Sequence, residues 1–473
     1  MTDEQAIAEM KETFELQKAA FAGNPYPSLD ERLAVLKTLK DMMFTYRTEI
    51  QEALKADFHT RPNQLTDLLE TFAVISRVDY TSENLAGWMA DIHREIDEGL
   101  FGTSKAYIRY QPKGVLGSII PWNFPFDVGL GPAIEMLAAG NRVMLKMSEF
   151  SPVSSELMKV MVEKFFDRDQ LAVVTGGTEV SKVFAALQWD HLMYTGGGVV
   201  GREVMVAAAK NLVPVTLELG GKNPVIVDED SIDESIIVNV LASKILNNGQ
   251  ICVSPDYCLV PEGQDKAFAG LIKQYFENTL PDYAQGGHIA GIINERHFDR
   301  LTQYVEDARN KGAEIIELGG TADRSTRGMP FTLILNPTEE MDVLKHEIFG
   351  PLFAIKTYKT MDDAISFVNI MDQPLGVYVF SKTRANIDKI VANTKSGGVS
   401  VNYSALHSTM MSLPFGGIGK SGCGRHHSQD GFNTFSNQRS IGELGDGGIL
   451  QEILPPYGQT VDDILTMIFS ESE

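Results

Sequence analysis

Short apolar runs alternate with helix-like segments along most of this chain, and that alternation restricts the possible folds more than any other feature. Beyond residue 102 come first GVLGSII, NRVMLKM, LAVVTGG, HLMYT and PVTLEL, and then NPVIV, YCLV, FAIKTY, LGVYVF and GGVSV. Strands that are apolar throughout are typical of a parallel sheet with helices on both faces. The sequence therefore predicts two successive α/β units, and we place the change between them near Gly220 and Gly221.

The residues before Gly102 have the periodicity of helices instead. In SLDERLAVLKTLKDMMFTY, one face carries four leucines: Leu29, Leu33, Leu36 and Leu39. Ser28 precedes them and can cap the helix. After the second apolar run, SPVSSELMKVMVEKFF predicts another helix, with Ser151 as its cap and Pro152 at its first position.

Length and charge narrow the class of protein. A chain of 473 residues exceeds what one hydrophobic core usually supports, so we expect two or more domains. The net charge of −22 argues against nucleic-acid partners and anionic membrane surfaces. The N-terminal stretch lacks the pattern of a secretory signal, and no run reaches the roughly 18 apolar residues of a spanning helix. We expect a cytoplasmic protein without stable membrane insertion.

The three cysteines, Cys252, Cys258 and Cys423, are too scattered to indicate a disulfide framework. Cys423 lies close to His426 and His427, but the sequence indicates no fourth ligand, so we expect no metal site. Cys258, in the strand-like YCLV, is predicted to lie in the core. Cys252, in NNGQICVS, is either a small apolar residue or a nucleophile, and the residue alone leaves both readings open.

A glycine pattern in YTGGGVVGRE indicates a dinucleotide site. Gly196, Gly198 and Gly201 form G-x-G-x-x-G, which lets a pyrophosphate approach the N-terminus of a helix. That pattern requires an acid about 20 residues on, and Glu218 stands at that spacing after Gly198. Glu218 therefore has two candidate roles. A second loop, GGIGKSG, has Pro414 where a phosphate loop needs glycine, so we reject an ATP-binding loop.

Six motifs then occur in a fixed order: PWNFP (121–125), LKMSEFSP (145–152), LELGGKNP (217–224), GQIC (249–252), EIFGP (347–351) and LPFGGIGKSG (413–422). Together they resemble the motifs of the aldehyde dehydrogenases over roughly residues 100 to 440. The chain as a whole is most similar to the bacterial coniferyl-aldehyde dehydrogenase branch. The resemblance implies an α/β fold with a Rossmann-type cofactor domain, a second parallel α/β catalytic domain and a small oligomerisation arm.

We expect the domains to divide the chain as follows: NAD-binding domain, 1–102 and 112–216; catalytic domain, 217–400; oligomerisation segments, 103–111 and 425–440; C-terminal tail, 441–473. SKAYIRYQP alternates and ends at proline, which predicts an edge strand or an extended arm. We expect a homodimer. The tail ends in ILTMIFSESE, and we expect a docked C-terminal segment, with a partner's groove or weak membrane contact as alternatives.

The resemblance also implies the chemistry. Cys252 is expected to attack the aldehyde as a thiolate, for which the ordinary thiol pKa of about 8.5 must be lowered. The side-chain amide of Asn123 and the backbone N–H of Cys252 are expected to donate to the oxyanion. Glu218 matches the base that activates water for thioester hydrolysis, and burial would raise its pKa towards neutrality. Gly220 and Gly221 are expected to leave room for this carboxylate to swing.

The cofactor that the resemblance implies is NAD. Lys146 and Glu149 match the contacts of the adenine ribose, and Glu149 would repel a 2′-phosphate, so NADP is a weaker possibility. Glu347 and Phe349 match the groups that hold the nicotinamide ribose and place the ring. The loop from Gly196 to Gly201 would lie near the pyrophosphate.

Three further expectations concern single residues around these motifs. Gly197 stands where the family often has serine, which removes one hydroxyl contact to the cofactor. Trp122 is assigned to the cofactor-binding residues, and with Tyr403 and His407 it either lines a substrate tunnel or packs in the core. Lys222, in GGKN, is expected to be structural.

The predicted activity is NAD-dependent oxidation of coniferyl aldehyde, or a similar aromatic aldehyde, to the acid through a cysteine thiohemiacetal and thioester. The alternatives within the fold are medium- or long-chain aliphatic aldehydes, semialdehydes, and transfer of the acyl group to coenzyme A. Glu218 argues against that transfer, because water activation serves only hydrolysis. A non-catalytic dinucleotide-binding or structural protein is the alternative of another class, and Cys252, Glu218 and Asn123 together argue against it.

Overall fold

The computed structural model describes residues 2–470, so residue 1 and residues 471–473 of the predicted tail lie outside the described residues. Five apolar runs form parallel strands of the first sheet: β3 (Val115–Ile119), β4 (Arg142–Lys146), β5 (Leu171–Val174), β6 (His191–Gly196) and β7 (Val215–Leu219). The order is β15-β7-β6-β3-β4-β5, and β15 (Gly422–Cys423) pairs antiparallel with β7. The first five predicted strands are confirmed.

The second sheet contains the other predicted strands, β8, β9, β12, β13 and β14, together with β10 and β11, which were not predicted. The order is β10-β11-β12-β9-β8-β13-β14. Their bounds are β8 (Pro224–Val227), β9 (Tyr257–Pro261), β10 (Glu314–Leu318), β11 (Phe331–Leu335), β12 (Leu352–Tyr358), β13 (Gly376–Phe380) and β14 (Gly398–Val401). Only β10, at the edge, runs antiparallel to its neighbour among these strands. Cys258 lies in β9 and is fully buried, as predicted.

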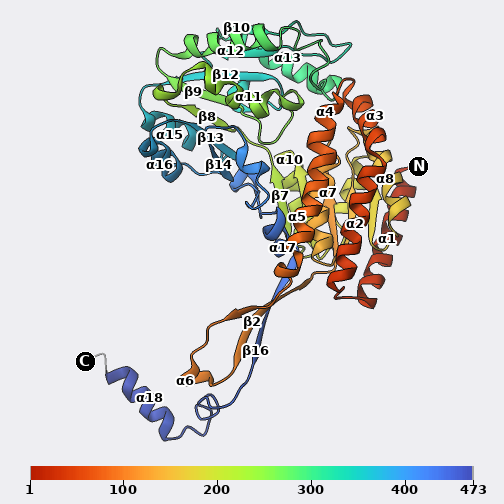
Figure 1. Cartoon of the computed structure of the whole chain (residues 1–473), viewed down its shortest axis with the longest axis vertical. Helices are drawn as coiled ribbons and strands as arrows, with labels where there is room; N and C mark the ends of the chain where they lie inside the picture. Colours follow the sequence, from red (N-terminus) through yellow and green to blue (C-terminus); the bar gives the residue numbers. More distant parts are fainter. Residues whose placement is uncertain (1, 471–473) are drawn as a thin grey trace.

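Helices cover both faces of the first sheet because the side chains of each strand alternate between two apolar cores (Figure 1). One face packs against α2 (Leu29–Thr45), α3 (Arg47–Phe58), α5 (Phe72–Trp88), α7 (Asp127–Ala138) and α8 (Pro152–Phe165). The other face packs against α1 (Asp3–Gly23), α9 (Thr178–Ala185) and α10 (Gly198–Ala209). In β4, for example, Val143 and Leu145 enter the first core and Met144 enters the second.

The second sheet is covered in the same way. On one face lie α13 (Glu295–Asn310), α15 (Met361–Ile370) and α16 (Arg384–Asn393), and on the other lie α11 (Ile237–Ile245) and α12 (Asp265–Thr279). The short elements are α4 (Asn63–Thr66), η1 (Asp67–Thr71), β1 (Ile92–Arg94), α6 (Glu98–Phe101), η2 (Glu229–Ser231), η3 (Glu234–Ile236), η4 (Leu246–Gly249), α14 (Asp342–Lys345), η5 (Leu406–Thr409), η6 (Gly419–Ser421) and α17 (Ser428–Thr434). The chain passes from the first sheet to the second across Gly220 and Gly221.

The helix predicted after Ser28 begins where the sequence indicates. The Ser28 hydroxyl accepts from the Glu31 backbone N–H, and the Glu31 carboxylate accepts from the Ser28 N–H. This reciprocal pair satisfies donors that would otherwise be left free at the helix start. Leu36 and Leu39, on the predicted apolar face of α2, are fully buried.

At the start of α8 the prediction was half wrong. Pro152 is the first helical residue, as expected, but the Ser151 side chain makes no capping hydrogen bond. The Asp57 carboxylate, on α3, accepts instead from the backbone N–H groups of Val153 at 3.1 Å and Ser154 at 2.8 Å. A charged acceptor on a neighbouring helix satisfies two free donors, whereas the serine hydroxyl would satisfy one.

An arm leaves the body as a three-stranded antiparallel sheet of β1, β2 (Lys105–Pro112) and β16 (Ser436–Glu443). The extended arm predicted for SKAYIRYQP is therefore confirmed. The arm carries the chain away from the body, and α18 (Gln459–Ser470) lies beyond it (Figure 1). No residue of α18 is buried, so the prediction of a docked tail is wrong for the described residues. Within residues 2–470, no helix combines the length and apolarity needed to cross a lipid bilayer.

The capping role of Asp57 makes a stability prediction. Replacing Asp57 with alanine leaves the N–H groups of Val153 and Ser154 without acceptors, and Ser154 is fully buried. We expect Asp57→Ala to lower the free energy of unfolding by about 1–3 kcal/mol. The matched control is Asp30→Ala, at an exposed position in the first turn of α2. Thermal unfolding of both variants measures the effect, and equal midpoints would contradict the capping role.

Candidate active site

An apolar cavity of about 400 Å³ lies between the two sheets. Its wall is built from α5, α7, the end of β7, α11 and the segment between β14 and β15. Four aromatic side chains contribute to it: Phe72, Phe124, Tyr403 and Phe415. Cys252 and Glu218, which belong to different α/β units, both line this cavity. The cavity can therefore hold an apolar molecule against a thiol and a carboxyl group.

A second cleft of about 390 Å³ begins where the first ends. Glu218 and Leu219 line the first cavity, and the next two residues, Gly220 and Gly221, line the second. Glu347 and Gly198 are also in the wall of the second cleft. The end of β7 therefore separates an apolar cavity from a more polar cleft, and a group bound at this point can reach both.

Side-chain amides hold the loop that carries Cys252. The Asn223 amide donates to the Cys252 carbonyl at 2.8 Å and to the Ser254 carbonyl at 3.0 Å. The Gln250 amide donates to the carbonyls of Asn247 and Gly291, both at 3.0 Å. Asn247 has a φ of 47°, a left-handed conformation that asparagine tolerates better than most residues. These contacts fix the backbone on both sides of the thiol.

The environment of the Cys252 thiol differs from the expectation. Burial, together with the nearby carboxyl groups of Glu218 and Glu347, raises the pKa of Cys252 to about 12. The expected lowering of this pKa is therefore not found. The physical reason is that apolar walls and two acids surround the sulfur, and both disfavour a thiolate. The thiol must lose its proton to a nearby base before it can attack.

Glu218 is 3% exposed, and neither of its carboxylate oxygens has a hydrogen-bond partner among residues 2–470. Burial raises the pKa of Glu218 well above its ordinary value, as a general base requires. A side chain at Gly416 would come within 2.8 Å of the Glu218 carboxylate, so glycine is needed there. A group with a raised pKa that faces a thiol can exchange a proton with it.

The space beside Gly220, which was expected to give the Glu218 carboxylate room to swing, is occupied by Glu347. A Cβ atom at Gly220 would overlap the carboxylate of Glu347, and the backbone N–H of Gly221 donates to that carboxylate at 3.1 Å. Burial raises the pKa of Glu347 to about 7, and the charge of Asp256 acts in the same direction. The two glycines therefore seat Glu347 against the end of β7.

Asn123 lies beside the Cys252 loop. Its side-chain amide is buried and donates to the Gln250 carbonyl at 3.2 Å. Its backbone carbonyl accepts from the guanidinium of Arg61 at 3.0 Å. Arg61 also forms a fully buried ion pair with Glu70, at 3.0 Å. Sequence reasoning missed Arg61 and Glu70, whose only signal is that each is a charged residue in the helical region that precedes the motifs.

The residues predicted to hold the adenosine half of a cofactor surround the ends of β4 and β6. Lys146, buried at the end of β4, donates to the carbonyls of Met147 at 2.6 Å and Gly176 at 2.8 Å. Burial lowers the pKa of Lys146 to about 8. Glu149 follows it and is exposed. These groups lie at the carboxyl ends of parallel strands, where α/β folds bind ligands.

The predicted glycine loop joins β6 to α10. Gly196 ends β6, Gly197 lies between the two elements, and Gly201 lies in the first turn of α10. Gly197 occupies the N-cap position of α10, where no side chain caps the helix and nothing lies within 4 Å of a Cβ atom built on it. A Cβ atom at Gly201 would come within 2.7 Å of Leu219, so this glycine permits close packing of α10 on β7. The uncapped helix start can bind an anion such as a pyrophosphate.

Trp122 and Phe349, from the PWNFP and EIFGP motifs, lie against each other. The ring of Phe349, whose φ is 47°, packs edge-on against Trp122 with centroids 5.3 Å apart. Trp122 does not line the 400 Å³ cavity. His407 does not line it either, because its ring is turned towards β14 and hydrogen-bonds the Ser400 hydroxyl at 2.8 Å. Of the three residues considered for the tunnel, only Tyr403 contributes to its wall.

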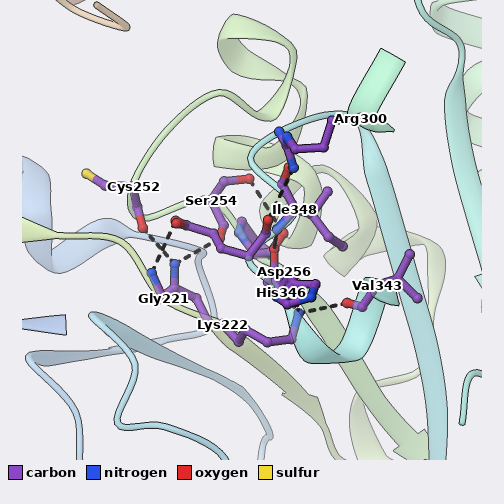
Figure 2. Close-up of polar contacts among 12 residues, drawn as sticks. Gly221, Lys222, Cys252, Ser254, Asp256, Arg300, Val343, His346 and Ile348 are labelled. Atoms are coloured by element: carbon purple, nitrogen blue, oxygen red, sulfur yellow. Dashed lines mark hydrogen bonds and ion pairs between the residues drawn. The ribbon is translucent and has the colours of Figure 1, made fainter. Parts of the chain in front are cut away.

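Lys222 organises the loop that carries His346 and Ile348 (Figure 2). Its ammonium contacts the Asp256 carboxylate and donates to the carbonyls of Val343 at 2.7 Å and His346 at 2.9 Å. Asp256 in turn accepts from the backbone N–H of Ile348 at 2.9 Å. The predicted structural role of Lys222 is therefore confirmed, and this network fixes the EIFGP segment.

His426 and His427 were considered only as metal ligands in the sequence, yet both line the apolar cavity. Their position follows from β15, which returns the chain to β7 and pairs Gly422 with Glu218. Within residues 2–470, no group of three His, Cys, Asp or Glu side chains is placed to hold a metal ion. No sequence pattern identified the two histidines as part of the cavity wall.

The raised pKa of Cys252 makes a prediction about its reactivity. At pH values well below the Cys252 pKa of about 12, little of the thiol is ionised. The rate of its alkylation by iodoacetamide should therefore rise about tenfold per pH unit from neutral pH upwards. Glutathione, as a free-thiol control, should level off near its ordinary pKa of about 8.5. Peptide mass spectrometry separates Cys252 from Cys258 and Cys423. A plateau for Cys252 near neutral pH would contradict this environment.

Comparison with known proteins agrees with this architecture. Residues 3–441 match the profile of the Aldehyde dehydrogenase family. A probable coniferyl aldehyde dehydrogenase of Caulobacter vibrioides is 40% identical over 96% of this chain and 95% of its own length. A dimeric, NADP-preferring aldehyde dehydrogenase of Canis lupus familiaris is 35% identical over 92% of this chain and 94% of its own length.

Solved structures share the fold over nearly the whole chain. The substrate-bound Staphylococcus aureus AldH superposes with a TM-score of 0.92, at 30% identity over 97% of this chain and 99% of that one. A Mycobacterium tuberculosis aldehyde dehydrogenase complexed with NAD⁺ has a TM-score of 0.83, at 27% identity over 93% of this chain and 91% of that one. The chain belongs to the aldehyde dehydrogenase family.

Proposed function

We propose that this protein oxidises an aromatic aldehyde to its carboxylic acid, with Cys252 as nucleophile, Glu218 as base and Asn123 as oxyanion donor. The observation that supports this best is the shared cavity, which brings a thiol and a buried carboxyl together from two α/β units. The alternative of a non-catalytic protein gives no reason to bury an unpaired carboxyl beside a thiol.

The reaction begins when the Cys252 thiol gives its proton to Glu218 and the sulfur attacks the aldehyde carbon. The oxygen of the aldehyde then accepts from the Asn123 amide and the Cys252 backbone N–H, and such donors typically contribute about 3–4 kcal/mol each. NAD, when bound, supplies the acceptor for the hydride that the aldehyde carbon loses. The acyl group is left on Cys252 as a thioester.

Hydrolysis then frees the enzyme. Glu218 first releases to solvent the proton that it took from Cys252. It then takes a proton from a water molecule, and the water oxygen forms a bond to the thioester carbon. The bond from that carbon to the Cys252 sulfur breaks, and the carboxylic acid leaves. Apolar walls exclude other water, so that the carboxylate and the thiol interact strongly. We do not propose acyl transfer to coenzyme A, because a buried base at Glu218 serves hydrolysis.

The residues around the second cleft fit NAD. The uncapped start of α10, at Gly197, suits the pyrophosphate, and Lys146 and Glu149 suit the adenine ribose. Glu347 and Phe349 would hold the nicotinamide half. Because the Glu149 carboxylate would repel a 2′-phosphate, we propose NAD as the preferred cofactor and NADP as the weaker one.

The proposed substrate is coniferyl aldehyde or a similar aromatic aldehyde. Aromatic rings contribute to the cavity wall, and they favour a flat, conjugated ligand over a flexible chain. A relative 40% identical to this chain is named for coniferyl aldehyde, which supports the same choice. Medium- or long-chain aliphatic aldehydes and semialdehydes remain the alternative.

We further propose a homodimer and a cytoplasmic location. Most of β16 is exposed along the arm, and an exposed strand offers unpaired edges to a second copy. A canine relative is described as dimeric, which supports this assembly. All three cysteines are free, as in a reducing compartment.

The proposed base is tested by Glu218→Gln, which keeps the size of the side chain and removes the proton acceptor. We expect steady-state NADH formation to fall by about 10²–10⁴-fold. Because Glu218 is the base of both steps, we expect acylation of Cys252 to slow as well, and any acyl group that forms should persist on Cys252 in mass spectra of quenched samples. Glu179→Gln, at an exposed position on α9, is the matched control and should keep its turnover. Loss of NAD binding with normal deacylation would favour the ribose role of Glu218 instead.

The proposed substrate class is tested by comparing cinnamyl-type aldehydes with straight-chain aldehydes. We expect kcat/KM to be at least about tenfold higher for the aromatic substrates, because aromatic contacts add to the apolar burial. Tyr403→Ala removes a ring from the cavity wall and should reduce that ratio. Tyr457→Ala, at an exposed tyrosine in the tail, is the matched control. A higher kcat/KM for aliphatic aldehydes would contradict the proposed substrate.

A further inference from the structure

A buried group of titratable side chains adjoins Glu218, and the reaction above does not use it. Its central residue is His426, which is 5% exposed and lines the substrate cavity. Glu135, on α7, lies behind His426 and is fully buried. Burying charged groups is costly unless they are paired, so the arrangement of these side chains needs a reason.

His426 lies between two carboxyl groups. Its Nε2 atom is 3.9 Å from the Oε1 atom of Glu218, and its Nδ1 atom is 3.6 Å from the Oε2 atom of Glu135. The two carboxyl groups thus face opposite nitrogens of one imidazole ring. Each distance is slightly longer than a hydrogen bond, so a small side-chain movement brings either contact within range.

The backbone fixes the ring in this place. His426 and Phe415 exchange two backbone hydrogen bonds, both of 2.8 Å, and their rings pack edge-on with centroids 5.5 Å apart. The preceding strand, β15, is paired with β7 at Glu218 itself. The register of this pairing sets the distance between the histidine ring and the carboxyl group of Glu218.

Glu135 is itself held in place on the far side. It accepts from the backbone N–H of Ser428 at 2.9 Å and of His427 at 3.2 Å, and Arg77 lies 3.5 Å away. These donors hold the Glu135 carboxyl group against the Nδ1 side of the His426 ring. The tautomer of His426 whose Nδ1–H faces Glu135 leaves Nε2 free to accept a proton from Glu218.

We propose that His426 is a positioning residue for Glu218. The Nε2 atom of His426 takes up the proton of the Glu218 carboxyl group, while Glu135 orients the imidazole ring. This inference rests on the proposed function, because it assumes that Glu218 is the base. The proposal gives a reason for the presence of His426 in the cavity wall, which neither the sequence motifs nor the cofactor cleft explains.

The proton balance is as follows. During hydrolysis Glu218 gains one proton from water, and the proton then moves from its Oε1 atom to Nε2 of His426. The result is a Glu218 carboxylate beside an imidazolium, whose Nδ1–H faces the Glu135 carboxylate. In this transfer only an O–H and an N–H bond change, and no electrons are transferred. When the C–S bond of the thioester breaks, the imidazolium returns its proton through Glu218 to the Cys252 sulfur, so that the thiol, the Glu218 carboxylate and the neutral imidazole are restored.

Other charged and titratable groups face this pair from the surrounding elements, and they set the pH at which it acts. They are Asp127 on α7, Arg77 on α5, Arg425, His427 and Asp430 around α17, and Cys252. Burial raises the pKa of Glu218, so the carboxyl group keeps its proton unless an acceptor is near. An imidazolium within about 4–6 Å lowers the pKa of a carboxyl group by about 1–3 units. His426 thus extends the active range towards lower pH.

The test measures, across pH, how fast the acyl group leaves Cys252 in His426→Gln. Glutamine keeps a similar reach and cannot take up a proton near neutral pH. p-Nitrophenyl acetate serves as the acyl donor, because it can acylate a cysteine without NAD. Mass spectrometry of quenched samples gives the acylated fraction of Cys252. His426→Asn is the second variant, and His288→Gln, at an exposed histidine, is the matched control.

We expect both variants at position 426 to acylate Cys252 and to show a deacylation profile whose acid limb lies about one pH unit or more above that of the wild type. At neutral pH their deacylation should be at least about tenfold slower, and at high pH it should approach the wild-type rate. The deacylation rate of the His288→Gln control should equal that of the wild type at every pH.

A variant that folds, as judged by its thermal unfolding, and whose acid limb coincides with that of the wild type would overturn the proposal. An equal loss of rate at every pH would also overturn it, because it would indicate a packing role alone. If wild-type protein forms no acyl group on Cys252, the proposed function itself fails, and that outcome is distinct from an unshifted profile.

Discussion

The structure of this site depends on one costly arrangement: the carboxyl group of Glu218 is buried in an apolar cavity opposite the thiol of Cys252. In water both groups would be hydrated, and here both pKa values are raised by burial. A thiol that holds its proton needs a base, and a carboxyl with a raised pKa is a stronger base than an ordinary one. Glu218 therefore supplies the base that the Cys252 thiol needs in order to lose its proton.

Several parts of the fold maintain this arrangement. The Lys222 and Asp256 pair ties the end of the first sheet to the loop that follows α14, and the Asn223 amide holds the backbone of Cys252. The pairing of β15 with β7 returns the chain from the second unit to Glu218 and brings His426 beside it. The cavity is thus fixed by contacts between distant parts of the sequence.

The sequence predicted most strands of the two sheets because most of these apolar runs are buried on both faces, and a local pattern is then sufficient. It missed β10 and β11. It failed where a partner came from elsewhere: α8 is capped by Asp57 and not by Ser151. The motifs identified Cys252 but not the direction of its pKa shift, which depends on acids brought close by folding. His426 was not predictable, because its two carboxyl neighbours lie on α7 and β7.

The most direct test of this account is the coupling between Glu218 and Cys252. The pKa of the Cys252 thiol, measured by thiolate absorbance or by alkylation across pH, is compared between wild type and Glu218→Gln. If the carboxylate faces the sulfur, its removal should lower the pKa of Cys252, because a neighbouring negative charge disfavours the thiolate. An unchanged pKa in a folded Glu218→Gln protein would contradict the shared cavity on which the proposed reaction rests.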